Sequence, residues 1–129
     1  MSDATYVLDA SALLCLIFGE AGDGRVEEVM AGAKISAVNY SEVIAKLIDR
    51  GMASDGLLGE LADLDLNVVS VDRRQAELAG LLRAQTRAAG LSLGDRACLA
   101  LAVVSNGTAI TADRAWAKVD VGVKIEVVR

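Results

Sequence analysis

The chain has 129 residues, and 53% of them are hydrophobic, which is enough to bury the core of one domain over residues 1–129 and excludes a disordered chain. Its formal net charge of −5 is unlike the basic surface of a general nucleic-acid-binding protein. The longest apolar run covers only residues 97–104, well short of the roughly 20 residues that span a bilayer, and the first residues lack a signal-peptide pattern, so we expect a soluble, cytoplasmic protein.

Strands and helices are expected to alternate along the chain. In chain order, the hydrophobic patterns predict a strand at 6–8, helices at 11–18 and 25–31, a strand at 34–38, helices at 40–50 and 54–64, a strand at 67–71, a helix at 72–89, a helix at 95–104, and strands at 108–111 and 124–128. This alternation predicts an α/β fold, in which a mainly parallel five-stranded sheet is covered by helices on both faces.

Three helices have an apolar face that we expect to be buried: Val43, Ile44, Leu47 and Ile48 in helix 40–50, Leu57, Leu58, Leu61 and Leu64 in helix 54–64, and Leu78, Leu81 and Leu82 in helix 72–89. Residues 97–104 are apolar all round, so this helix should be buried on more than one side. Cys15 and Cys98 lie in apolar segments without a Cys-x-x-Cys spacing, and we interpret them as buried free thiols rather than a metal pair.

Four acidic residues stand where an α/β sheet forms its sites. Asp9 ends the first predicted strand and Asp113 follows the fourth, while Glu42 and Asp95 lie in the first turns of two helices. Such sites form beyond the carboxyl ends of the strands, so neighbouring first and fourth strands would place Asp9 and Asp113 over one crevice. The alternative is that each acid only caps a helix. Asp9 and Asp113 would then be N-caps, and Glu42 and Asp95 would each form a capping box with the residue three positions earlier.

Gathering these acids has an energetic consequence that points to a metal ion. Two carboxylates about 5 Å apart repel by about 3 kcal/mol at an effective dielectric constant of about 20. Four together would require protonation, separation or a bound cation. Because the chain has no histidine and no usable cysteine pair, all ligands would be oxygens, which favours Mg²⁺ or Mn²⁺ over Zn²⁺.

The four acids also lie in four sequence motifs, VLDASAL around Asp9, NYSEV around Glu42, LSLGDRACLALA around Asp95 and TADRAW around Asp113. In order, spacing and length, nearly the whole chain resembles the PIN-domain ribonuclease toxins of VapBC-type toxin–antitoxin modules. The resemblance implies a three-layer α/β/α sandwich with strand order 3-2-1-4-5, Mg²⁺-dependent RNA hydrolysis that leaves a 5′-phosphate and a 3′-hydroxyl, homodimers and a cognate antitoxin. Trp116 stands where family members often have an aromatic residue.

The resemblance and the charge argument together give each residue a predicted role. The four acids would be the catalytic metal ligands, Asp9 and Asp95 directly, and Glu42 and Asp113 through water or by holding a second ion. Ser11 and Thr111 would hydrogen-bond a ligand carboxylate or the phosphate, or else cap a helix or loop. Four basic residues would contact RNA phosphates: Lys46, Arg50, Arg96 and Arg114. The alternative for each is a solvated charge without a ligand, and for Lys46 a further alternative is an ion pair with Glu42.

Two other functions stay open at the level of the sequence. The chain could be a catalytically silent metal-binding module that holds a partner protein. It could also be an Asp-based phosphatase or phosphoacceptor domain, but the phosphatase pattern requires a second aspartate where Ser11 stands. The leucine face of helix 54–64 could serve core packing, a dimer contact or an antitoxin groove.

Overall fold

The fold is built around one five-stranded sheet in a computed structural model that describes residues 4–129. Its strands are β1 (Tyr6–Leu8), β2 (Ala33–Ser36), β3 (Leu66–Val69), β4 (Thr108–Thr111) and β5 (Ile125–Val127). Every neighbouring pair is parallel and the order is β3-β2-β1-β4-β5, which confirms the predicted topology. The central strand β1 pairs with β2 on one side and with β4 on the other, so the order of the chain reverses between β1 and β4.

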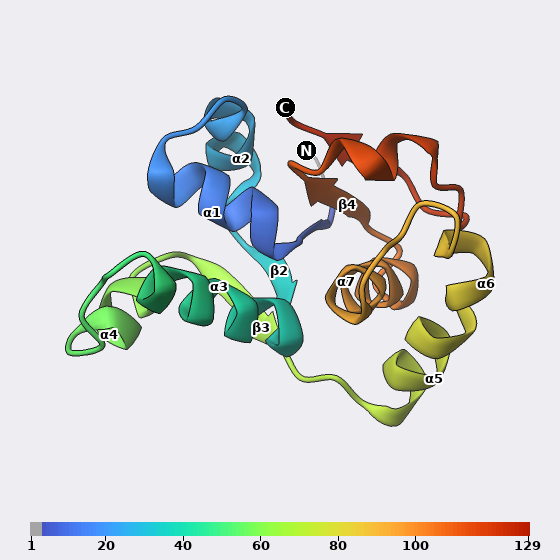
Figure 1. The fold of residues 1–129 in the computed structure, drawn as a ribbon, viewed down its shortest axis with the longest axis horizontal. Coiled ribbons are helices and arrows are strands. Elements are labelled where there is room, and N and C mark those ends of the chain that lie inside the picture. The colour runs from blue at the N-terminus through green and yellow to red at the C-terminus, as the bar shows by residue number, and fades with distance from the viewer. Residues whose placement is uncertain (1–3) are drawn as a thin grey trace.

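Helices cover both faces of the sheet and complete the predicted three-layer arrangement (Figure 1). One face carries α1 (Ala10–Phe18), α2 (Asp23–Val29), α3 (Ala37–Asp49) and α4 (Leu57–Ala62). The other carries α5 (Arg73–Leu81), α6 (Arg83–Thr86) and α7 (Leu93–Val104), and the 3₁₀ helix η1 (Arg114–Lys118) lies between β4 and β5. Within residues 4–129, no helix is long and apolar enough to cross a membrane.

Two apolar cores, one on each side of the sheet, follow from the alternation of side chains along the strands. In β1, Leu8 belongs to the core beneath α1 and α3, whereas Val7 belongs to the core beneath α7, and both are fully buried. Helix α7 packs against β1, β2 and β4, and its residues 97–102 are all buried, as the apolar run predicts. Cys15 and Cys98 are buried free thiols, which confirms their interpretation.

Two predicted elements differ from the structure because of local side-chain hydrogen bonds. The strand predicted over 34–38 ends at Ser36, whose hydroxyl accepts a hydrogen bond from the backbone N–H of Val38 and caps α3. Helix α3 therefore begins at Ala37, three residues earlier than predicted. The helix predicted over 72–89 is divided into α5 and α6, and the Thr86 hydroxyl donates to the Leu82 carbonyl, a type of bond that bends helices. The other boundaries agree within a few residues.

Three side chains that were expected in the core are exposed instead. The exposed fraction is 42% for Ile48, 61% for Leu58 and 73% for Leu81. The stripe by which a short helix meets the core is narrow, and in α4 it consists of Leu57 and Leu61, one turn apart, which leaves Leu58 outside. The apolar faces predicted from the sequence are therefore too wide.

Candidate functional site

Asp9 lies at the carboxyl end of the central strand β1 and is the N-cap of α1. Its Oδ1 accepts hydrogen bonds from the backbone N–H of Ala12 and from Ser11 Oγ, both at 2.8 Å. Its Oδ2 accepts a hydrogen bond of 2.5 Å from Thr111 Oγ1 at the end of β4. The neighbouring ends of β1 and β4 thus hold one carboxylate in place, and Asp9 is only 3% exposed. Both predicted supporting hydroxyls contact it.

The environment of Asp9 disfavours its negative charge. Burial raises the pKa of this carboxyl from 3.8 to about 6, and the charge of Asp95 adds to the rise. The hydrogen bonds from Thr111, Ala12 and Ser11 act in the opposite direction but do not cancel the effect of burial. Within residues 4–129, no lysine or arginine forms an ion pair with Asp9. The ionised carboxylate is therefore buried without a protein cation to balance it.

Asp95 lies in the first turn of α7, where it forms the predicted capping box with Ser92. Asp95 Oδ2 accepts from the Ser92 backbone N–H at 2.9 Å, and Ser92 Oγ accepts from the Asp95 backbone N–H at 3.2 Å. Capping is therefore one role of this side chain. It does not remove Asp95 from the site, because the charge of Asp95 also raises the pKa of Asp9.

Glu42 reaches the first turn of α7 through contacts that the sequence interpretation missed. Because α3 begins at Ala37 with Ser36 as its cap, Glu42 is in the second helical turn and the predicted capping box with the Asn39 backbone is wrong. Instead, Asn39 Nδ2 donates to Glu42 Oε1 at 2.9 Å and to the Gly94 carbonyl at 3.0 Å. A Cβ atom on Gly94 would lie 2.5 Å from Glu42 Oε1, so a larger residue there would displace this carboxylate from its present position.

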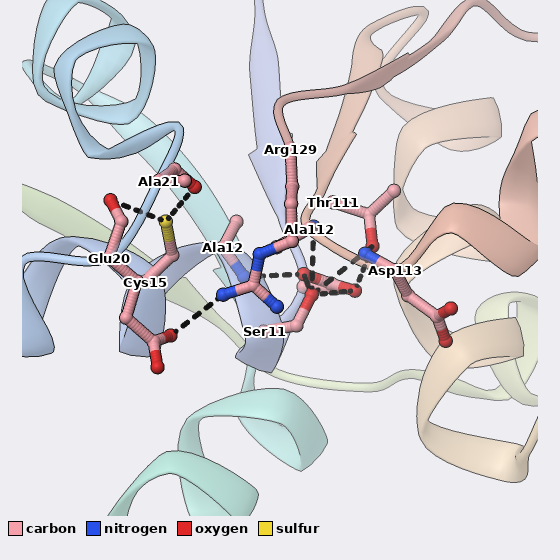
Figure 2. Close-up of polar contacts among 10 residues, drawn as sticks. Ser11, Ala12, Cys15, Glu20, Ala21, Thr111, Ala112, Asp113 and Arg129 are labelled. Atoms are coloured by element: carbon pink, nitrogen blue, oxygen red, sulfur yellow. Dashed lines mark hydrogen bonds and ion pairs between the residues drawn. The ribbon is translucent and has the colours of Figure 1, made fainter.

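Asp113 follows β4 and caps the short helix η1, with its Oδ1 accepting a hydrogen bond of 2.9 Å from the Ala115 backbone N–H. Its side chain is exposed, and Figure 2 shows it extending away from Ser11. The backbone is tied to the site, since the Asp113 N–H donates to Thr111 Oγ1 at 3.0 Å. Asp113 also borders an open pocket of about 490 Å³ that reaches Ser11. The structure therefore places Asp113 at the rim of the site, with its carboxylate engaged as a cap.

The predicted basic residues divide into two groups. Lys46 of α3 and Arg50, the C-cap of α3, line a pocket of about 240 Å³ together with Ser11, and Arg114 lines the pocket that Asp113 borders. The alternative ion pair between Glu42 and Lys46 does not form within residues 4–129. Arg96 lies elsewhere: its Nη1 donates to the Ala79 carbonyl of α5 at 3.0 Å, so this side chain joins α7 to α5 and is directed away from the site.

The sequence matches the PIN domain family over residues 6–122. The chain belongs to the PIN-domain family. PIN domains are typically nucleases and generally use divalent metal ions. The four motifs that suggested this family all lie within the matched region.

Several solved structures of similar fold are proteins of toxin–antitoxin systems. The DNA-bound VapBC of Salmonella typhimurium superposes with a TM-score of 0.74 at 17% identity, covering 98% of this chain and 99% of the other. A toxin–antitoxin complex of Klebsiella pneumoniae has a TM-score of 0.70 at 21% identity, with coverages of 88% and 91%. VapC20 of Mycobacterium tuberculosis, a sarcin–ricin loop cleaving toxin, has a TM-score of 0.70 at 16% identity, with coverages of 92% and 98%. A comparison with curated proteins finds no match.

The acids of this PIN domain fit a hard divalent cation by their chemistry. Burial, followed by the charges of Asp9, Asp95 and Glu42, raises the pKa of the Cys98 thiol, so three carboxylates act on one point of the interior. Carboxylate oxygens are the ligands that Mg²⁺ and Mn²⁺ prefer. As the side chains lie, no three acidic or cysteine residues between 4 and 129 are arranged to ligate one ion, and Asp95 and Asp113 each serve a helix cap. The oxygen donors therefore fit such an ion by their chemistry, whereas their present positions do not form a complete ligand shell.

Proposed function

We propose that this PIN domain is a Mg²⁺-dependent ribonuclease that acts as the toxin of a toxin–antitoxin pair, with Mn²⁺ as a possible substitute metal. The observation that carries the proposal is Asp9: a buried carboxylate with no protein cation beside it, placed at the point where the order of the sheet reverses. Ligand sites of open α/β sheets form at such a point. The similarity to VapC20, which cleaves the sarcin–ricin loop, favours RNA as the substrate.

The residues divide between holding the metal and holding the substrate. Asp9 and Asp95 would hold the ion directly, and Glu42 and Asp113 would complete its surroundings. When bound, a divalent ion would stabilise charge on the scissile phosphate and lower the pKa of the attacking water. The other functional side chains fix the acids or attract the phosphates: Ser11 and Thr111 fix Asp9, Asn39 fixes Glu42, and Lys46, Arg50 and Arg114 attract RNA.

An antitoxin and a second copy of the chain are the expected protein partners. The supporting observation is that several proteins of the same fold were solved as toxin–antitoxin complexes. Of the leucine face predicted to meet either the core or a partner, Leu57 and Leu61 are buried in the core, whereas Leu58 stays exposed. Ile48 of α3 is exposed as well, so these two side chains are candidates for a partner surface.

RNA cleavage by the purified, antitoxin-free protein tests the proposal. We expect total RNA, which includes ribosomal and transfer RNA, to be cleaved with Mg²⁺ and left intact with EDTA. Asp9→Asn and Asp95→Asn should abolish cleavage, whereas Asp72→Asn, at the exposed N-cap of α5, should cleave like the wild type. An uncleaved RNA pool in Mg²⁺ and in Mn²⁺ would favour a catalytically silent metal-binding module, and full activity of both site variants would show that the ligand assignment is wrong.

A further inference from the structure

A basic pocket lies beside the acidic site and involves a residue that no motif contains. We call it the α1–α3 pocket; it has a volume of about 240 Å³, and besides Leu14 and Ala112 it is lined by Ser11, Phe18, Glu20, Lys46, Arg50 and Arg129. Three of these side chains are cationic and one is acidic, so the net charge of the lining side chains is +2, in a chain whose formal net charge is −5. Such a concentration of cations favours a polyanionic ligand.

The cations of the α1–α3 pocket are available to a ligand. Within residues 4–129, neither Lys46 nor Arg50 forms an ion pair with the protein. The Arg50 guanidinium lies over the Phe18 ring, 4.5 Å from its centre, which restricts its position without neutralising it. The charge of Arg50 is therefore oriented and uncompensated.

Arg129 stands between this pocket and the catalytic centre. Its Nη2 donates to Glu20 Oε1 at 3.0 Å, and Figure 2 shows the guanidinium lying between Glu20 and Ser11. An arginine has five N–H donors in a planar fork, and the bond to Glu20 is the one hydrogen bond found for the Arg129 guanidinium within residues 4–129. The remaining donors suit the bidentate recognition of a phosphate.

The α1–α3 pocket continues into the pocket at Asp113. Ser11 and Arg129 border both, and Arg114 lines the far side of the second pocket. Ser11 Oγ also donates to the carboxylate oxygens of the buried Asp9, so a residue shared by both pockets contacts this acid directly. A chain of phosphates following these pockets would pass Ser11 and Arg129, which border both.

We propose that the α1–α3 pocket binds an RNA backbone phosphate adjacent to the cleavage site, with Arg129 as its principal ligand. This inference rests on the proposed ribonuclease function, because it assigns one subsite of that substrate. Glu20 orients Arg129 and partly offsets its charge, whereas Lys46 and Arg50 hold the same phosphate or the next one from the other wall. Arg129 is a substrate-positioning residue and takes no part in proton transfer.

Binding of a short fluorescent oligouridylate to the Asp9→Asn protein in Mg²⁺ measures the subsite without cleavage. Arg129→Ala should weaken binding about tenfold, the size expected for one charge-assisted hydrogen-bonded contact. It should also lower the slope of log affinity against log salt by about 0.7, the value for one lost contact to a single strand. Arg74→Ala is the matched control, since Arg74 is exposed on α5 without an ion pair within residues 4–129, and it should change neither quantity.

Glu20→Gln separates a subsite from a merely structural ion pair. If Arg129 binds phosphate, removing its acidic partner should tighten binding several-fold, opposite to Arg129→Ala. If the pair only holds the chain together, both variants should lose stability alike and neither should change the salt slope, which would overturn the proposal. In the cleaving protein, Arg129→Ala should raise KM and leave kcat nearly unchanged.

The failures of the subsite and of the ribonuclease function have different signatures. If the wild type cleaves RNA and Arg129→Ala has an unchanged KM, the proposed subsite is wrong and the ribonuclease function is supported. An inactive wild-type protein whose oligouridylate binding still depends on Arg129 would remove the ribonuclease function and keep an RNA-binding pocket. Loss of antitoxin affinity in Arg129→Ala, with unchanged RNA affinity, would assign the pocket to a protein partner and overturn the proposal.

Discussion

Replacing Asp9 by asparagine tests whether the site is electrostatically strained when no metal is bound. A rise of the pKa from 3.8 to about 6 corresponds to about 3 kcal/mol, at about 1.4 kcal/mol for each pKa unit. Because the folded protein holds the Asp9 proton more tightly than the unfolded chain does, this contribution to stability is complete below pH 3.8 and is lost as the pH rises through about 6. Above pH 6, therefore, the ionised Asp9 destabilises the folded wild type by the full amount of about 3 kcal/mol.

The asparagine variant keeps the shape of the side chain and most of its hydrogen bonds. Its carbonyl can accept from the Ala12 N–H, as Oδ1 of Asp9 does, and its amide can donate to Thr111 Oγ1. Allowing about 1 kcal/mol for imperfect hydrogen bonds, Asp9→Asn should be more stable than the wild type by about 2 kcal/mol at pH 7.5 in EDTA. At pH 4 the advantage should vanish.

Urea denaturation from pH 4 to pH 8 in EDTA measures this difference. The matched control is Asp72→Asn, because Asp72 is also a helix N-cap and accepts a hydrogen bond of 2.8 Å from the Gln75 N–H, but it is exposed. Asparagine and aspartate cap helices about equally well, so this control should stay close to the wild type at every pH. A destabilised Asp9→Asn protein at pH 7.5, or a stability difference that does not change with pH, would refute the reasoning.

Adding millimolar Mg²⁺ should make the wild type more stable than Asp9→Asn, because binding stabilises only the protein that holds the ion. The melting temperature should therefore rise for the wild type alone. Gly94→Ala should displace the Glu42 carboxylate and reduce cleavage at least tenfold. The free energy of unfolding should be unchanged or slightly higher, because alanine favours helices. A fully active variant would mean that Glu42 is dispensable. Leu81→Lys, at a side chain that is 73% exposed, should change the unfolding free energy by less than about 0.5 kcal/mol. Leu99→Ala, at a fully buried position of α7, should cost about 2–5 kcal/mol, and equal effects of the two substitutions in urea denaturation would contradict the assignment of the core.

The sheet and the positions of the acids could be predicted because they depend on local patterns. The short apolar strands, the apolar run in α7 and the four motifs are continuous stretches of sequence, and the strand order followed from the family resemblance. Asp9 at the end of β1 and Asp95 in the first turn of α7 lie where the sequence placed them.

The missed features depend on contacts between segments that are distant in the sequence. Asn39 donates to Glu42 and also to the Gly94 carbonyl, which is 55 positions away in the chain. An asparagine or a glycine in the sequence does not by itself indicate such a bond. Arg129 reaches Glu20 across 109 positions and lies outside every motif. The direction of Arg96, which follows a proposed ligand in the sequence but turns to α5, depends on the side-chain conformation and on the packing of α5 against α7.

Capping and metal binding, which are alternatives when the sequence is considered alone, are compatible in the structure. Asp95 uses Oδ2 for the Ser92 N–H and Asp113 uses Oδ1 for the Ala115 N–H, so each cap occupies one oxygen of a carboxylate that has about four acceptor sites. A cap therefore fixes the direction of an acid and leaves it free to bind a cation. Ser92→Ala removes the hydroxyl that accepts from the Asp95 N–H but keeps the Ser92 backbone N–H that holds Asp95 Oδ2, so it should cost about 1 kcal/mol in helix stability and change the affinity for Mg²⁺ little. Titration with Mg²⁺, followed by the melting temperature, measures both effects, and a large loss of Mg²⁺ affinity would show that the backbone N–H alone does not fix the direction of the acid.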